Sequence, residues 1–453
     1  MTEPPVLDSL DWKLFAERHW DREPVLFRGV APAPFQADEV FRAAVQGTRP
    51  PGPRLMPPNA QFTIGREQQT RPGSWLPQPS DGSLAGYGER LARELGGRRY
   101  ALVVHGFHTG HAPLWQRERA FYQGLWEQVG QPAGGVITTL FHGTYEHSPV
   151  GVHRDRFATF MYALRGRKRM RFWPVRPWSG PMTTVLDYAH CRESSFSVEV
   201  APGDLLYWPS SHYHVGESAA GGDEPATSVN VGVPREDHRA VTDLMDLLVG
   251  LDASALLTLE TDIGRLPRVP DSLLVPPAEA PAGLSGELPA ALDRALALFR
   301  GLGEPGRLAD LVRVRSLEHW TAGGFRPAPP PGPLPPPAAD AEVLRATEPV
   351  LWTEGEDGEL LCGAAGHVAR TRLPRPDLIR LLRALGGARP PAVGALLSGL
   401  PSGTAAAAGR LLRELESFGA VARERAGSAP ARDASATRDT GDHAVDGFLA
   451  ADG

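Results

Sequence analysis

Short apolar runs alternate with Gly- and Pro-containing turns between residues 99 and 235. Seven of these runs are rich in Val, Tyr, Phe, Thr and Trp and have the length of strands; in chain order they are RRYALVVHGF, GGVITTLFHGT, FATFMYAL, KRMRFWPV, SFSVEVA, GDLLYWP and TSVNVGV. Several short strands separated by tight turns are typical of a β-sandwich or barrel. One helix, WQRERAFYQGLWEQVG, interrupts them. The pattern therefore predicts a mainly β core over residues 99–235.

The region before this core, residues 1–98, has a different pattern. The segment LDWKLFAERHW carries apolar residues at helical spacing (Leu10, Leu14 and Phe15), and the apolar run PVLFRGV follows it. This order predicts a helix that leads into a strand. Residues 46–98 are rich in Pro, Gly and polar residues, so we expect loops there before the chain enters the barrel.

After Pro234 the apolar pattern becomes helical. HRAVTDLMDLLVGLD and ELPAALDRALALFRGLG each show an apolar stripe, so we expect residues 236–325 to form a helical region that could pack against a second subunit. The Pro-rich stretch RPAPPPGPLPPPAAD, residues 326–340, is typical of a semi-rigid linker.

The last part of the chain reads as a separate unit followed by a tail. Residues 341–425 contain two short strand-like runs, PVLWTE and GELLCG, and three helical patterns, RPDLIRLLRALGG, PPAVGALLSGL and AAAAGRLLRELESFGAVAR. Strands and three helices in a unit of this size predict a winged helix-turn-helix. Residues 426–453 are small and polar, and we expect them to be disordered.

Composition narrows the class of protein. A chain of 453 residues with 42% hydrophobic content exceeds one usual core, so several globular domains are expected. We find no apolar run long enough to span a membrane and no secretory signal pattern, and we expect a cytoplasmic protein. Two cysteines are too few for a disulfide framework or a thiolate zinc site. The net charge of −6 makes nucleic acid an unlikely general partner.

The segment GVHRDRFATF carries the first candidate metal ligands. Side chains alternate between the two faces of a strand, so His153 and Asp155 point the same way. About sixty residues later, APGDLLYWPSSHYHVGES supplies His212 and His214. Two His and one carboxylate suit an Fe(II) oxygenase, which needs open positions for a bidentate cosubstrate and O₂. Zinc hydrolases also use two His and a carboxylate, so the ligand set leaves both possibilities open.

Lys168 points to an anionic ligand near this metal. The chain contains only two lysines, Lys13 and Lys168, and uses Arg elsewhere. In RGRKRMRFWP the two-residue period places Lys168 with Met170 and Phe172 on the inner face, and it places Arg167, Arg169 and Arg171 on a solvated outer face. A buried ammonium is costly unless it meets an anion or caps an internal carboxylate.

Other polar residues share the inner register. In TSVNVGV, Ser228 and Asn230 lie on one face, and Thr159 follows His153 and Asp155 on theirs. These side chains could bind an acid or orient a metal ligand, and each could equally be a satisfied polar group of the core. His142 and His147 lie close enough in sequence to line the mouth of the barrel.

These motifs together resemble the JmjC class of 2-oxoglutarate-dependent oxygenases, in the cupin-like branch that includes asparaginyl hydroxylases and bacterial ribosomal oxygenases. The matching segments cover about residues 10–235: FAERHWDREPVLFRG, HRD, GRKRMRFWP, PGDLLYWPSSHYH and SVNVGV. The resemblance implies a double-stranded β-helix, the jelly roll of cupins. It also implies Fe(II) as cofactor, with 2-oxoglutarate and O₂ as cosubstrates.

The resemblance assigns roles to individual residues. His153, Asp155 and His214 become the iron ligands, and His214 is preferred to His212 because the family's distal His falls five residues after the Pro of this turn, here Pro209. Lys168 stands where the family places the cation for the distal carboxylate of 2-oxoglutarate. The family often has Thr or Ser just before the iron-binding pair, and this chain departs from that pattern by offering Ser148 at a different offset.

The resemblance also suggests a substrate. Ribosomal oxygenases carry a helical dimerisation region and a C-terminal winged helix after the barrel, and small winged-helix elements occur in peptide-modifying enzymes. We therefore expect a dioxygenase that hydroxylates a side chain of a polypeptide, either a ribosomal protein or a modified peptide, with succinate and CO₂ as coproducts; N-demethylation uses the same chemistry. The alternatives are a metal-binding cupin-like regulator with a DNA-binding winged helix and an O₂-independent cupin isomerase or hydrolase.

Overall fold

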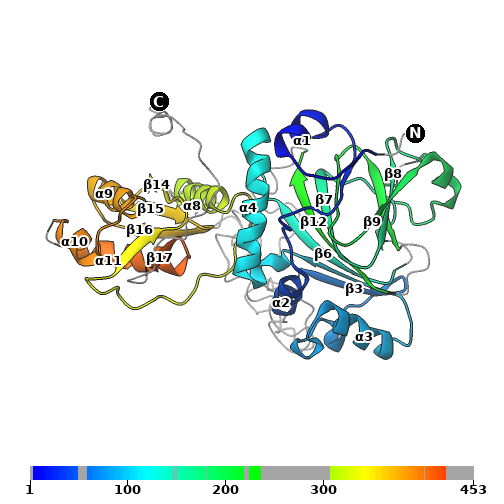
Figure 1. Ribbon diagram of the computed structural model, residues 1–453, viewed down its shortest axis with the longest axis horizontal. Coiled ribbons are helices and arrows are strands. Elements are labelled where there is room, and N and C mark those ends of the chain that lie inside the picture. Colours follow the sequence, from blue (N-terminus) through cyan, green and yellow to red (C-terminus); the bar gives the residue numbers. More distant parts are fainter. Residues whose placement is uncertain are drawn as a thin grey trace, which may run out of the picture.

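Two β-sheets and a separate C-terminal unit make up the part of the chain that the structure describes (Figure 1). The computed structural model describes residues 4–48, 59–145, 148, 150–180, 182–218, 224–235, 307–401 and 403–424. Most of the expected dimerisation region and the expected tail lie outside these residues, so both stay predictions. Among the described helices, none combines the length and apolar character that crossing a membrane requires.

The larger sheet has nine strands and contains five of the seven strands predicted between residues 99 and 235. Its strands, in spatial order, are β1 (Val6–Leu7), β2 (Val25–Phe27), β10 (Leu205–Trp208), β7 (Phe157–Arg165), β12 (Ala226–Pro234), β6 (Ile137–Gly143), β5 (Tyr100–His105), β3 (Ala60–Ile64) and β4 (Glu67–Gln68). All neighbours in this sheet are antiparallel except β1 and β2, which are parallel.

The smaller sheet closes the barrel. It has the order β11 (Tyr213–Ser218), β8 (Lys168–Trp173) and β9 (Phe196–Val200), all antiparallel. Side chains from the inner faces of both sheets pack into one apolar cluster, which includes Met161 and Trp208 from the larger sheet and Met170 and Phe172 from the smaller one. Two sheets that enclose one core form a cupin-like jelly roll, as the resemblance implied.

Residues 46–98 are not mainly loops, so that expectation was wrong. The described part of this stretch contains β3, β4, two short 3₁₀ turns (Gly73–Trp75 and Pro79–Asp81) and an eleven-residue helix, α3 (Leu84–Glu94). β3 pairs with β5 over five residues, so it extends the sheet of the barrel. The apolar pattern of AQFTI was too short to identify alone, because its stability comes from a partner strand about forty residues away.

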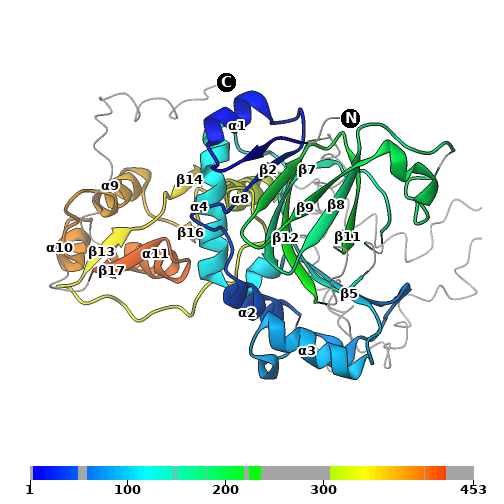
Figure 2. The ribbon, with the colours of Figure 1, turned by 45° about the vertical axis from the view of Figure 1, so that its right-hand side comes forward.

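Helices cover the outer face of the larger sheet. α1 (Trp12–Arg18), α2 (Ala37–Gly47) and α4 (Ala112–Val129) pack there with α3 to form the largest apolar core of the described chain. Asp11 caps α1 by accepting a hydrogen bond from the backbone N–H of Leu14. Figure 2 shows α4 running between the barrel and the C-terminal unit. Several hydrogen bonds anchor that unit to α4; among them, Trp115 donates to the carbonyl of Phe325, and Arg119 pairs with Glu348.

The C-terminal unit has its own apolar core. It contains α8 (Arg307–Thr321), the pair β13 (Val343–Ala346) and β17 (Val421–Glu424), the sheet β14 (Leu351–Glu354), β15 (Leu360–Ala364) and β16 (His367–Thr371), and the helices α9 (Arg375–Leu385), α10 (Val393–Ser398) and α11 (Ala405–Ser417). The expected helix over residues 405–423 ends at Ser417, and its last residues form β17. The two expected strands are β14 and β15 and the three expected helices are α9, α10 and α11, whereas β13, β16 and β17 were not expected. The winged-helix assignment remains a prediction.

Candidate metal centre

Two segments that are far apart in the sequence bring the candidate ligands together. His153 lies just before β7, and His214 is the second residue of β11. Their backbones pair directly, because the N–H of each His donates to the carbonyl of the other at 3.1 and 2.8 Å. The two imidazole rings therefore lie side by side with centroids 4.5 Å apart.

The carboxylate of Asp155 completes the cluster. Its two oxygens lie 3.5 Å from Nε2 of His153 and 3.5 Å from Nε2 of His214. One ligand atom from each of the three residues falls within 4.8 Å of the other two. The His-x-Asp spacing and the later His thus converge on one point, with a donor set of two imidazoles and one carboxylate that suits a divalent metal ion.

Backbone contacts fix which imidazole nitrogen faces that point. Nδ1 of His153 donates to the carbonyl of Gly151 at 2.9 Å, and Nδ1 of His214 donates to the carbonyl of His212 at 3.3 Å. Because Nδ1 of each ring donates to a carbonyl, Nε2 of each ring is the nitrogen that faces the carboxylate of Asp155. Such hydrogen bonds orient the imidazoles of protein metal sites, so the residues present fit a bound metal ion.

Gly151 is required for this backbone path. Its φ is +74°, which L side chains rarely adopt, and a Cβ there would lie 2.5 Å from the carbonyl oxygen of Val185. Val152 forms two backbone hydrogen bonds with the same Val185. The glycine therefore lets the chain turn closely against the 174–195 segment and enter the strand with His153 correctly placed.

The electrostatics of the cluster favour an ionised Asp155 beside a neutral His153. Burial raises the pKa of Asp155, but the hydrogen bond and charge of His214 and the charge of His153 outweigh it, so the pKa falls to about 2. Burial and the neighbouring His214 lower the pKa of His153. At neutral pH both groups are in the protonation states that bind metal ions.

Among the residues that the structure describes, the other histidines take no part in this cluster. His212 is nearly buried, and its Nδ1 hydrogen-bonds Ser211 at 3.1 Å. His142 does not line the mouth, contrary to expectation: it is fully buried on the outer face of β6, between the hydroxyls of Tyr100 and Thr227 at 3.1 and 2.8 Å. It pairs across the sheet with Thr227 on β12, so it lies outside the barrel. His147 lies outside the described residues.

Lys168 points into the barrel. Its side chain is 5% exposed and its Nζ donates to the hydroxyl of Ser228 at 3.0 Å. The ammonium also lies 4.7 Å from the ring centre of Phe141 and 5.8 Å from that of Tyr145. Burial lowers the pKa of Lys168 to about 7. No ion pair joins this ammonium to a carboxylate within the described residues, so the group has the surroundings of a site for an anion.

Gly216 was missed in the sequence and makes room for that side chain. A Cβ at this position would lie 3.1 Å from Cε and 3.7 Å from Nζ of Lys168. Gly216 follows His214 by two residues on β11. The side chain of Lys168 therefore passes β11 close to His214. The inward register of HVGES was the available signal, because a glycine two residues after an inward His leaves a gap on the same face.

Arg171 does not belong to a solvated face, so that part of the expectation was wrong. It is 9% exposed and binds the buried carboxylate of Glu217 at 2.9 Å, which also accepts a hydrogen bond from Tyr188. The alternation itself is correct, because Arg171 does face away from the barrel. Its outer face is buried because residues 182–195 fold back over the smaller sheet, where Tyr188 and Cys191 form a separate apolar cluster with Trp173 and Val215.

The remaining predicted residues also face the interior. Thr159 shares the inner face of β7 with Met161, and Ser228 and Asn230 pair across the sheet with Ala163 and Met161. Thr159 and Ser228 are buried, whereas Asn230 is partly exposed and its Oδ1 has no hydrogen-bond partner. A partly exposed amide inside the barrel can bind a polar ligand. The roles of these residues stay predictions.

Comparison with known proteins supports the class. The family model described as the JmjC domain matches residues 127–239, the segment that contains β6 to β12 and all three candidate ligands. This match confirms the JmjC resemblance, and with the His-Asp-His cluster it confirms the expected use of Fe(II) and 2-oxoglutarate. The curated proteins contain no match.

Solved structures with similar chains include three of YcfD from Escherichia coli. One is an X-ray structure of YcfD; the others are titled as a ribosomal oxygenase in complex with cobalt and 2-oxoglutarate, and with cobalt and succinic acid. Each is 18% identical and covers 92% of this chain, with 98%, 99% and 99% of its own chain covered and TM-scores of 0.44, 0.43 and 0.43.

Proposed function

We propose that this protein is an Fe(II)- and 2-oxoglutarate-dependent dioxygenase that hydroxylates a side chain of a protein or peptide. The observation that carries the proposal is the convergence of His153, Asp155 and His214. The buried ammonium of Lys168 lies beside β11, the strand that carries His214. The coproducts would be succinate and CO₂.

The three ligands would hold the metal on one side. Two imidazoles and a carboxylate would hold the ion and leave it open to the 2-oxo acid and O₂. Fe(II) with bound 2-oxoglutarate supplies the oxidation of an unactivated C–H bond by O₂. The protein keeps the Nε2 lone pairs of His153 and His214 aimed at the ion through the carbonyls of Gly151 and His212.

Lys168 would bind the far carboxylate of 2-oxoglutarate. Its side chain lies against Gly216, which is two residues from His214. Two residues of strand span about 7 Å, a distance that a five-carbon dicarboxylate can bridge between a metal and an ammonium. The anion would favour the charged lysine and raise its pKa from about 7. Ser228 already binds Nζ at 3.0 Å and would hold the ammonium in place.

The interior around these groups would orient the cosubstrate and exclude water. The partly exposed amide of Asn230 and the hydroxyl of Thr159 lie on neighbouring strands of the same inner face. Met161, Leu206 and Trp208 surround them with buried apolar surface. Polar groups that are fixed inside an apolar wall bind and position a ligand with little rearrangement.

The test is anaerobic reconstitution with Fe(II) and 2-oxoglutarate. We expect a visible charge-transfer band, then succinate on admission of O₂, with both strongly reduced in Lys168→Ala. Lys13→Ala is the matched control, because Lys13 is the other lysine of the chain and is exposed. Bound metal without a band would contradict the proposal and favour a metal-binding regulator. Candidate polypeptides are then screened by mass spectrometry for the gain of one oxygen atom.

A further inference from the structure

Hydrogen bonding holds His214 less tightly than it holds His153. Nδ1 of His153 lies 2.9 Å from the carbonyl oxygen of Gly151, whereas Nδ1 of His214 lies 3.3 Å from that of His212. N–H···O bonds in proteins usually measure roughly 2.7–3.2 Å, so the second contact is longer than usual. The imidazole of His214 therefore needs a further support if its Nε2 is to stay directed at the carboxylate of Asp155.

The indole of Trp208 lies against this imidazole. Trp208 is the last residue of β10 in the larger sheet, whereas His214 belongs to β11 in the smaller sheet, so the contact crosses the barrel. The two ring centres are 5.0 Å apart, and the ring planes make an angle of 54°. Aromatic rings with centres roughly 4.5–7 Å apart attract each other beyond the burial of their surface. Trp208 thus supports His214 from the opposite wall.

The indole itself has little freedom to move. Trp208 is 1% exposed, and β10 pairs with β2 on one side and with β7 on the other. Pro209 follows, and the residue before a proline is restricted to extended backbone. The ring of Phe172 packs against the indole with centres 5.5 Å apart. A side chain fixed in this way limits the movement of the ring beside it.

The indole N–H of Trp208 contributes no hydrogen bond. Its Nε1 is buried and has no partner among the residues that the structure describes. A buried N–H without a partner is unfavourable, and a Phe at this position would avoid that cost. The side chain therefore acts on His214 through the contact of its ring and not through its N–H.

We propose that Trp208 is a positioning residue of the metal centre, whose ring keeps the imidazole of His214 in the orientation that presents Nε2 to the metal ion. This inference rests on the metal-binding part of the proposed function. It goes beyond that function by assigning a role to a residue that is not a metal ligand. The long hydrogen bond of His214, the ring contact across the barrel and the fixed indole together carry it.

The test is proton NMR of the full-length protein loaded with Co(II). A paramagnetic ion shifts the protons of its ligands far from the other signals. We expect two shifted signals that disappear in D₂O, one from the Nδ1–H of His153 and one from that of His214. A His214→Gln variant identifies the signal of His214 by its loss. Calorimetry gives the Kd for Co(II) in the same samples.

Trp208→Leu and Trp208→Phe separate the ring contact from the rest of the side chain. Leu is apolar but too short to reach the imidazole, so the signal of His214 should broaden or vanish while that of His153 stays. The Kd for Co(II) should rise about 10-fold, as for other residues that orient a metal ligand. Phe keeps a ring and loses only an unpaired N–H, so it should retain both signals and most of the affinity.

Trp115→Leu is the matched control. Trp115 is also a buried tryptophan, 3% exposed, but it lies on α4 outside the barrel. Its replacement should lower the free energy of unfolding and leave both shifted signals and the Kd for Co(II) as in wild type. Circular dichroism checks that each variant is folded.

The results separate this inference from the proposed function. Unchanged signals and Kd in Trp208→Leu would overturn the inference, and so would an equal change in both signals, because that would mean general loosening of the site. A loss in Trp208→Phe as large as in Trp208→Leu would show that the N–H acts instead of the ring. If wild type binds Co(II) without two shifted exchangeable signals, the ligand set is wrong, and the proposed function falls together with the inference.

Discussion

Replacing Lys168 with Met should stabilise the ligand-free protein and weaken its binding of 2-oxoglutarate. Met has nearly the same length and can follow the same path past Gly216 without a charge. In the ligand-free protein Lys168 is buried and its pKa falls from 10.5 to about 7. The unfolded chain therefore binds a proton at this site more readily than the folded chain does.

The size of the effect follows from that shift. Below pH 7 the lysine is charged in both states, and the full shift corresponds to a cost of about 5 kcal/mol to the folded state. Between pH 7 and 10.5 the folded lysine is neutral and the cost falls as pH rises, to about 2 kcal/mol at pH 9. The wild type should thus gain about 3 kcal/mol of stability from this group between pH 6 and pH 9. Lys168→Met lacks that gain.

The assay is urea unfolding of ligand-free wild type and Lys168→Met at pH 6 and pH 9, followed by tryptophan fluorescence. Other titrating groups contribute equally to both proteins, so the difference between the two pH differences isolates Lys168. With Zn(II) and 2-oxoglutarate present, wild type should become the more stable of the two proteins. The carboxylate of 2-oxoglutarate stabilises the ammonium of Lys168, and Lys168→Met has no ammonium to gain from it. If the free energies of unfolding of the two ligand-free proteins depend equally on pH, Lys168 is not a buried lysine with a lowered pKa.

Three further predictions concern the candidate site. Asp155→Ala should weaken binding of Co(II) by about 100-fold or more in calorimetry, whereas His212→Ala should leave it nearly unchanged; equal losses would place the wrong histidine in the cluster. Gly216→Val should displace the side chain of Lys168 and raise the Kd for 2-oxoglutarate by about 10-fold, with metal affinity retained. An unchanged Kd would mean that Lys168 does not bind 2-oxoglutarate. Gly151→Ala should lower the free energy of unfolding by about 2 kcal/mol and weaken metal binding, while Gly135→Ala, which meets no atom within 4 Å, should do neither in the same measurements.

The sequence predicted those parts of the site that depend on strand periodicity. Successive strand residues alternate faces, so the inward direction of Lys168 followed from its neighbours Met170 and Phe172. The same rule placed His153 and Asp155 on one side of the chain, although β7 begins only at Phe157 and both residues lie before it. The order and approximate bounds of the strands between 99 and 235 could also be predicted, because each run is apolar, short and bounded by turn residues.

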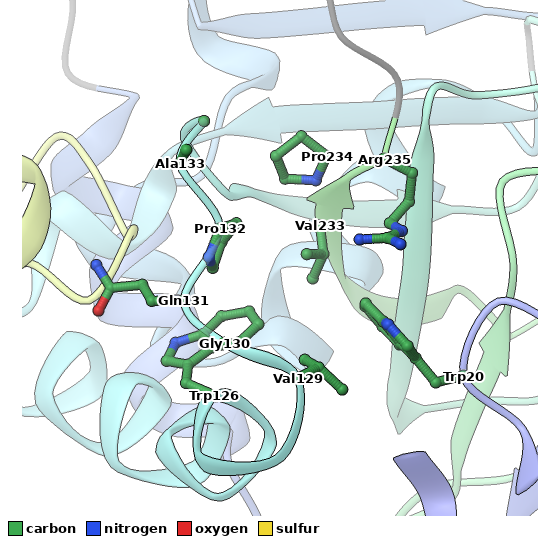
Figure 3. Close-up of a pocket in the computed structure, with 11 residues that line it drawn as sticks. Trp20, Trp126, Val129, Gly130, Gln131, Pro132, Ala133, Val233, Pro234 and Arg235 are labelled. Carbon is green, nitrogen blue, oxygen red and sulfur yellow. The ribbon is translucent and has the colours of Figure 1, made fainter. Parts of the chain in front are cut away.

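Tertiary structure decided which faces are covered and which segments meet. Arg171 faces outward as the pattern requires, but it is buried because residues 182–195 fold over it, and nothing near it in the sequence signals that cover. His142 became a core residue because α3 packs beside the outer face of its strand, where Tyr87 contacts its ring. The pocket beside the end of β12 needs Trp20, Trp126 and Pro234 from three distant segments (Figure 3). Periodicity acts over neighbouring residues and is visible in the chain, whereas burial by a distant segment depends on packing that only the folded molecule establishes.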